Sequence, residues 1–164
     1  MKAELGIRGI DGVLKTLNSL PAEVVSKRGG PVKLSLAKGA RFLRDRYKEN
    51  LRRAIHSGKT TRSTGELEKR VIASRGKKPF GTKGERYLVR IKKRDYLNAD
   101  GVRTNPLMVA NLLEYGSSHQ PATPFARPTA VQHGQETINI VINDLKQRLD
   151  KTVAKLAAQN KGRR

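Results

Sequence analysis

Cysteine and tryptophan are both absent from this chain of 164 residues, and the other aromatic residues are scarce, with four Tyr and three Phe. The lack of cysteine excludes disulfide bonds and thiolate metal sites, and it is typical of proteins made in a reducing cytoplasm. Although the apolar share is only 36%, a chain of this length can bury the core of one domain. Contacts with neighbouring subunits would add to its stability.

Long apolar runs are also missing. None approaches the roughly 20 residues that a helix needs to span a bilayer. The N-terminal sequence MKAELGIRG lacks the apolar stretch of a signal peptide. We therefore expect a protein that is made in the cytoplasm, has no membrane partner, and is used there or within a larger particle.

Acidic residues are few, because 14 Asp and Glu stand against 35 Lys and Arg, which gives a net charge of +21. So unbalanced a chain repels itself unless it meets a polyanion or an acidic protein, although part of the charge is simply a solvated face. The cations concentrate in three blocks, residues 38–62, 69–94 and 146–164. The side chains expected to contact DNA phosphates or an acidic partner are Arg41, Arg44, Lys48, Arg52, Lys77, Lys78, Lys92 and Lys93.

Residue patterns of catalytic and metal sites are scarce as well. The three histidines, at positions 56, 119 and 133, form no i, i+4 pair and lie near no carboxylate cluster. The run SGKTT at 57–61 looks like the end of a phosphate-binding loop, but Arg53 stands where that motif requires its first glycine. Glu66 and Glu68 lie among cations, where salt bridges explain them. We expect no enzyme activity, no cofactor and no small-molecule substrate.

The spacing of apolar residues predicts an α+β fold. Three- and four-residue steps from Leu36 to Ile55 and from Ile138 to Leu156 predict two long amphipathic helices, and Ile10–Leu17 predicts a shorter one. Alternation predicts strands at 3–7, 71–73 and 86–92, with a partner strand near Tyr96. We expect a small, mainly antiparallel sheet packed by the long helix and the C-terminal helix, in one domain over 1–159 followed by a basic, flexible tail at 160–164.

A proline-rich stretch joins the body of the chain to its last helix. Pro106 predicts the start of a short apolar helix, and Gly116 predicts its end. Three prolines then follow within eight residues: Pro121, Pro124 and Pro128. Proline fixes φ and removes a backbone donor, so this segment is expected to be stiff and to lie outside any sheet. Phe125 is its one large apolar group and is expected to anchor it in a pocket.

Glu114 ends the apolar helix that precedes this stretch. An unpaired acid would be costly there if it were buried, so it requires a cation or backbone donors nearby. We interpret Glu114 as a structural residue or an ion-pair partner rather than as a general base.

Three short runs of this region carry a family resemblance: EYGSS at 114–118, QPA at 120–122 and PFARP at 124–128. Together they resemble the signature of the HK97 gp10-like family of tail-completion or neck proteins of tailed phages. The opening glycine and first helix at 9–14, the TGEL turn at 64–67 and the terminal helix resemble the same family in the same order. The matching motif residues are Glu114, Tyr115, Gly116, Pro121, Pro124, Phe125, Arg127 and Pro128.

The resemblance implies a structural virion protein, made in the cytoplasm of the host bacterium, that completes the tail and joins it to the head. It implies a ring of about six copies, whose closure requires heterologous contacts. The expected neighbours are head-closure proteins and tail-terminator or tube proteins, with DNA phosphates in the channel. The motif would then be either a subunit contact or a well-packed crossover within the domain. From the charge alone, sequence-nonspecific nucleic-acid binding is the alternative function.

Overall fold

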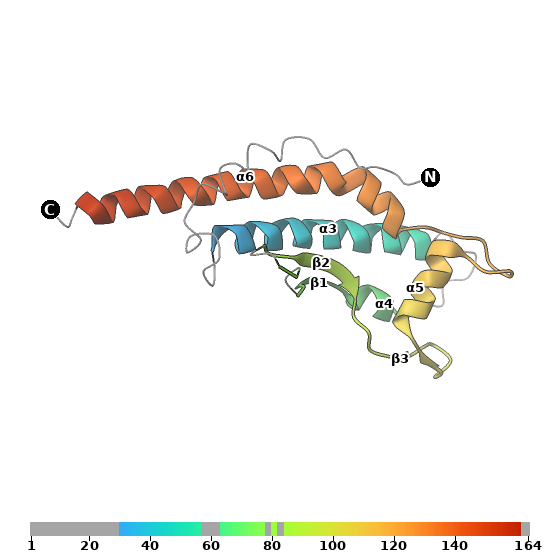
Figure 1. Ribbon diagram of the computed structural model, residues 1–164. Coiled ribbons are helices and arrows are strands. Elements are labelled where there is room, and N and C mark those ends of the chain that lie inside the picture. The colour runs from blue at the N-terminus through green and yellow to red at the C-terminus, as the bar shows by residue number, and fades with distance from the viewer. Residues whose placement is uncertain (1–29, 57–62, 78–79, 82–83, 162–164) are drawn as a thin grey trace.

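The structure, a computed structural model, describes residues 30–56, 63–77, 80–81 and 84–161, with side chains described as far as residue 154. Its elements are α3 (Pro31–His56), α4 (Glu66–Lys69), β1 (Val71–Arg75), β2 (Tyr87–Ile91), β3 (Tyr96–Leu97), β4 (Arg103–Thr104), α5 (Pro106–Tyr115) and α6 (Ala126–Lys161) (Figure 1). The strand predicted at 3–7, the helix predicted at 10–17, and Lys78 lie outside the described residues.

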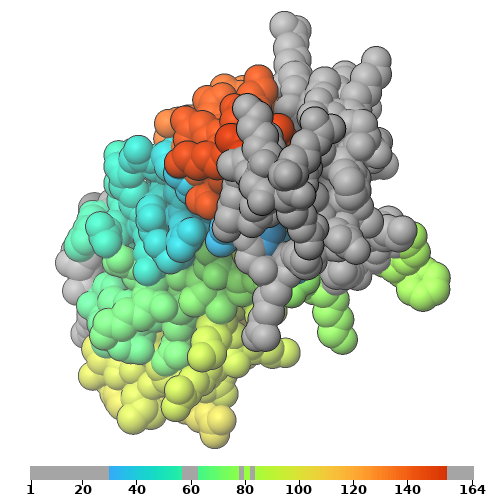
Figure 2. Space-filling view, turned by 90° about the vertical axis from the view of Figure 1, so that its left-hand side faces the viewer, coloured from blue at the N-terminus to red at the C-terminus, as the bar shows by residue number. Residues whose placement is uncertain are grey.

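Helix α3 is the central layer of an α+β fold, which confirms the predicted class. The β1–β2 hairpin packs on one side of α3, and α6 lies along the other side (Figure 1). The end-on view shows the same order, with α6 (orange) above α3 (blue to cyan) and the strands (green) below (Figure 2). The expectation that both long helices cover the sheet was therefore wrong for α6. Helix α6 packs on α3 instead, because the face of α3 towards α6 carries two small residues, Ser35 and Gly39, which are both buried.

The strands form two separate two-stranded sheets instead of the single sheet that was predicted. Strand β1 pairs antiparallel with β2, from Val71 opposite Ile91 to Arg75 opposite Tyr87. Strand β3 pairs with β4, so the strand predicted at Tyr96 does not join the main sheet. The turn explains this, because the Asn98 side-chain oxygen accepts hydrogen bonds from the backbone N–H groups of Asp100 (3.0 Å) and Val102 (2.8 Å) and folds the chain back on itself.

The core lies where α3, α4, β1, α5 and the start of α6 converge. Its buried apolar residues are Leu51, Leu67, Val71, Ala110 and Phe125. They come from five places in the sequence, so the core joins the α3 body to the proline-rich stretch. Burial of large side chains such as Leu and Phe is worth about 1.5–3 kcal/mol each.

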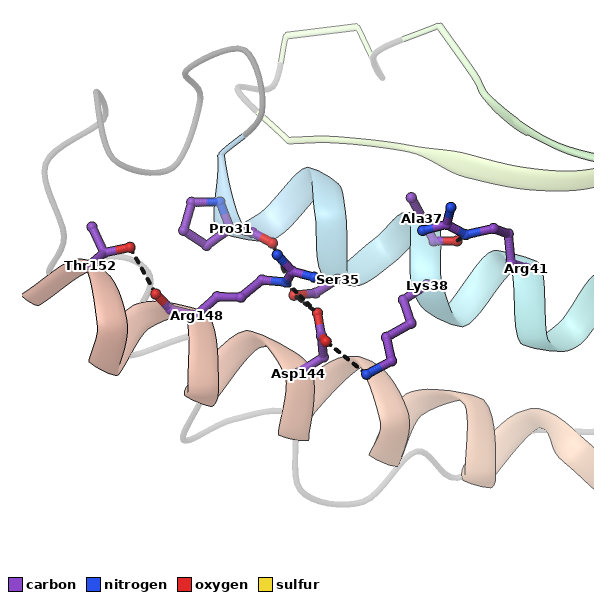
Figure 3. A network of polar contacts seen from close by, with 8 residues as sticks. All are labelled: Pro31, Ser35, Ala37, Lys38, Arg41, Asp144, Arg148 and Thr152. Atoms are coloured by element: carbon purple, nitrogen blue, oxygen red, sulfur yellow. Dashed lines mark hydrogen bonds and ion pairs between the residues drawn. The ribbon is translucent and has the colours of Figure 1, made fainter.

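The interface between α3 and α6 is held by close packing and by a buried acid (Figure 3). Asp144 accepts hydrogen bonds from Ser35 Oγ (2.9 Å), Lys38 Nζ (2.8 Å) and Arg148 Nε (2.5 Å). The hydrogen bonds from Arg148 and Lys38 hold the pKa of Asp144 far below its usual range, although burial opposes this. The acid is therefore ionised and paired across the interface.

Most of the apolar stripe predicted for α6 is buried or half-buried, as expected. Leu145 is buried, but Val153 is exposed, so the prediction that Val153 packs inward was wrong. By that point α6 has run past the first turn of α3 and has no neighbour there among the described residues (Figure 1). The helix also continues to Lys161, two residues into the predicted tail.

Candidate functional site

Residues 116–124 of the proline-rich stretch form a narrow arm between α5 and α6, and the other motif residues lie at either end of it. It projects from the end of the molecule (orange in Figure 1). Ser117 and Gln120 pair across its tip, where the Ser117 N–H donates to the Gln120 carbonyl at 2.8 Å and the reverse bond measures 3.3 Å. Closer to the root, the Thr123 N–H donates to the Leu113 carbonyl at 2.8 Å. These bonds hold both sides of the arm in one position.

Gly116 ends α5, as predicted, and allows the two sides of the arm to approach. Its φ is 75°, and its N–H donates to the Leu112 carbonyl at 2.8 Å. A β carbon at this position would lie 2.7 Å from the Ala122 nitrogen and 2.8 Å from the Gln120 oxygen. Both the backbone conformation and the close approach therefore require glycine.

Glu114 caps the first turn of α6 from the last turn of α5. Its carboxylate accepts three backbone hydrogen bonds, from the N–H groups of Phe125 (2.8 Å), Ala126 (2.8 Å) and Arg127 (3.0 Å). Burial is the largest single influence and opposes ionisation, but the three bonds together outweigh it and lower the pKa of Glu114. Of the two partners that the sequence left open, the structure provides backbone donors, so Glu114 fixes the angle between α5 and α6.

Phe125 anchors the arm at its root. The side chain is 1% exposed, and its ring meets the Tyr47 ring edge-on, with centroids 5.1 Å apart. Burial also raises the pKa of Tyr47 to about 12. One turn into α6, the buried Thr129 donates to the Phe125 carbonyl at 2.6 Å and accepts from Asn50 Nδ2 at 2.9 Å. The root is thus tied to α3.

The remaining motif residues lie on the outside. Pro121, Pro124 and Arg127 are exposed, Tyr115 is exposed on α5, and Pro128 is half-buried in the first turn of α6, as predicted. The structure therefore separates the motif into a buried root and an exposed surface. The sequence did not identify Asn50 and Thr129 as residues that hold the root of the arm. The helical spacing of Tyr47 indicated a core residue but not its contact with Phe125.

The predicted basic contacts divide into two groups. On α3, Arg44 pairs with Asp45 (2.7 Å) and Arg52 with Glu68 (2.5 Å), so their charges are partly neutralised. Arg41 donates to the Ala37 carbonyl, and Lys48 is half-buried. The other group is Lys77, Lys92 and Lys93, which are all exposed.

A row of cations that begins just before β2 and ends just after it is the more open basic surface. It consists of Arg86, Arg90, Lys92, Lys93 and Arg94, all exposed and none in an ion pair within the described residues. We call these five residues the β2 row. Arg86, Arg90 and Arg94 were not predicted as contacts. Their alternation with Tyr87, Val89 and Ile91, of which Val89 and Ile91 pack against the core, could have identified Arg86 and Arg90 as outward-facing.

The described residues contain no group of three or more His, Asp or Glu side chains able to hold a metal ion. His119 is exposed at the tip of the arm, and His133 lies 3.3 Å from Glu136 on α6. Among the helices of the described part, none is long and apolar enough to cross a membrane.

Comparison of the chain with protein-family models, with curated proteins and with solved structures finds no match.

Proposed function

We propose that this chain is a structural virion protein of a tailed phage, located in a ring at the head–tail junction, where it joins tail to head. The observation that carries the proposal is the arm. Three of the residues that resemble the neck-protein signature, Gly116, Pro121 and Pro124, lie in one projecting element. Glu114 and Phe125, also of the signature, fix its root, and Pro121 and Pro124 are exposed along it.

A fixed arm suits a contact between large assemblies. An element that is already ordered loses little conformational entropy when it docks, so more of the contact energy is available for association. The arm reaches beyond α5 and α6 (Figure 1), where a neighbouring subunit or ring can meet it. In a closed ring each subunit uses two different patches, which agrees with an arm at one end of the molecule. Head-closure and tail-terminator or tube proteins are the proposed neighbours.

Deletion of the gene from its phage, followed by electron microscopy of the lysate, tests this role. We expect DNA-filled heads and complete tails that remain separate, and we expect the wild-type gene supplied in trans to restore joined particles. Normally joined particles without the protein would overturn the proposal.

A matched pair of variants in the same experiment tests the arm. Ser118→Trp places a bulky ring at the exposed tip, whereas Ala130→Trp places the same ring on an exposed position of α6. Neither site is buried, so both variants should fold and accumulate equally. Ser118→Trp should restore few joined particles and Ala130→Trp many. Equal restoration by the two would show that the arm tip makes no essential contact.

Nucleic-acid binding without sequence preference is the second candidate function, and the β2 row favours it. Five exposed cations without ion-pair partners in the described part can meet phosphates directly. Fluorescence anisotropy with two unrelated duplexes should give equal affinities that fall steeply with salt. Replacing Arg90 and Lys92 by Gln should weaken binding to both duplexes alike. Each replacement removes about one phosphate contact, so the slope of log affinity against log salt concentration should fall by about one per residue. Undetectable binding at low salt would exclude this function.

A further inference from the structure

We infer that residues 10–17 of this chain pack as a short helix on one flank of α6, formed by Ile138, Ile142 and Leu149. We call these three residues the α6 flank. The contact holds α6 from a second side, and it does not depend on the function proposed above.

The face of α6 that meets α3 is defined by its contacts. Thr137 and Val141 lie against Gly39, and Asp144 accepts a hydrogen bond from Ser35. The α6 flank begins one position later along the sequence, which is about 100° further around a helix. It therefore points sideways from α3 rather than into it.

The α6 flank belongs to a continuous apolar strip. Ile138 and Ile142 are four residues apart, Leu145 follows after three more, and Leu149 after another four. Side chains at these steps are neighbours on a helix. Leu145, on the side nearer to α3, is buried, whereas the three flank residues are half-buried. Among the described elements α3 alone packs along α6, which is the outermost of the described layers (Figure 1), so no described element is the partner of this flank.

Residues 10–17 have an apolar face that fits such a strip. Ile10, Val13, Leu14 and Leu17 recur at three- and four-residue steps, so they share one side of a helix. Eight residues that include Gly12 do not make a helix that is stable alone in water, so this segment requires a surface to pack on.

The connection to α3 keeps this segment within reach of the α6 flank. Just over one turn into α3, Ser35 bonds to Asp144, which lies within the span of the flank. Twelve residues, 18–29, join the segment to Gly30; they can span up to about 40 Å, whereas the flank is only about 16 Å long. A short tether raises the effective concentration to about the millimolar range. The chain's own segment therefore occupies the flank before a second copy does.

Thiol labelling of the full chain tests this contact, because the sequence has no cysteine of its own. Ile142→Cys places a thiol on the α6 flank, and Val141→Cys, one position earlier, places a thiol against α3 as the matched site. Leu14→Asp puts a charge into the apolar face of the segment. Combined with it, the thiol at position 142 should react with maleimide about tenfold faster, while the thiol at position 141 should react as before. Thr16→Asp puts the same charge beside that face and should leave both rates unchanged.

Equal labelling of position 142 in the Leu14→Asp and Thr16→Asp chains would overturn the inference. If Leu14→Asp releases both thiols, Leu14→Ala, which only shortens the side chain, should still release position 142 alone. Release of both thiols by this milder variant would contradict a local contact. Protection of position 142 should also be constant over about a hundredfold range of protein concentration, as an intramolecular contact requires. Protection that grows with concentration would identify a second copy, and not residues 10–17 of the same chain, as the cover.

Discussion

Glu114→Gln is the most informative single substitution, because it changes the cap of α6 without changing its size. The carboxylate accepts three backbone hydrogen bonds from residues 125–127. Glutamine keeps one acceptor oxygen but replaces the other by an NH2 group, which faces N–H groups instead of accepting from them. The negative charge at the helix N-terminus is also lost.

The magnitude follows from these two losses. A hydrogen bond to a charged group is worth about 1.5–3 kcal/mol net, and a charge near a helix N-terminus adds about 0.3–1 kcal/mol. Since glutamine retains part of the cap, we expect the free energy of unfolding to fall by about 2 kcal/mol. For a chain of this size that corresponds to a Tm lower by about 4–8 °C.

Thermal or urea unfolding at pH 7 measures this difference, and Glu136→Gln is the control. Glu136 is exposed on the same helix, and within the described residues its partner is His133, so its replacement should cost less than about 0.5 kcal/mol. Equal stability of the two variants would refute the capping account.

The pH dependence gives a second check on the cap. The pKa of Glu114 is lower in the folded chain than its ordinary value of 4.5. Its stabilisation is therefore complete above about pH 4.5 and is lost as pH falls through the folded pKa. The difference between wild type and Glu114→Gln should shrink in that range. A difference that persists in acid would mean that the charge is not what stabilises the cap.

Two further predictions concern the arm and the helix interface. Gly116→Ala should destabilise the chain by about 3 kcal/mol or more. The control is Gly101→Ala, which has a similar positive φ but open space around it and should cost only about 1–2 kcal/mol. Similar losses at both sites in urea unfolding would contradict the close packing at the arm root. Asp144→Asn should lower the free energy of unfolding by about 2 kcal/mol at pH 7, and this loss should diminish as pH falls below 3.8 towards the lower folded pKa. The control is Asp45→Asn, at an exposed ion pair, which should cost under about 1 kcal/mol. An equal effect of the two substitutions would contradict the buried network.

Local features were the ones that the sequence predicted well. Helix α5 begins at Pro106 and ends at Gly116 because both residues act within one turn of their own position. The spacing of apolar residues located α3 and most of α6 for the same reason.

Long-range pairings were less predictable. The partner of β3 is only two residues long, Arg103–Thr104, which is too short to show alternation. Asp144 meets Ser35 across 109 positions of sequence, and neither residue has a local pattern that indicates the other. The expectation that α6 covers the sheet failed because periodicity predicts that a helix has an apolar face but not which element it covers.

The candidate site shows the same division. Residue chemistry indicated that Glu114 needs donors and that Phe125 needs a pocket, but the donors and Tyr47 are supplied by the fold. Among the cations, sequence could not tell Arg52, which is paired with Glu68, from the β2 row, which has no ion pair within the part of the chain that the structure describes. Whether an acid lies within reach of a given arginine depends on tertiary structure.

Locating the protein in its own particle tests the central claim most directly. Gold labels on a C-terminal tag, combined with quantitative mass spectrometry of purified phage, would show where the chain lies and in how many copies. We expect the label at the head–tail junction and several copies per particle, as a ring requires. A chain that is absent from purified particles, or labelled elsewhere on them, would contradict the account.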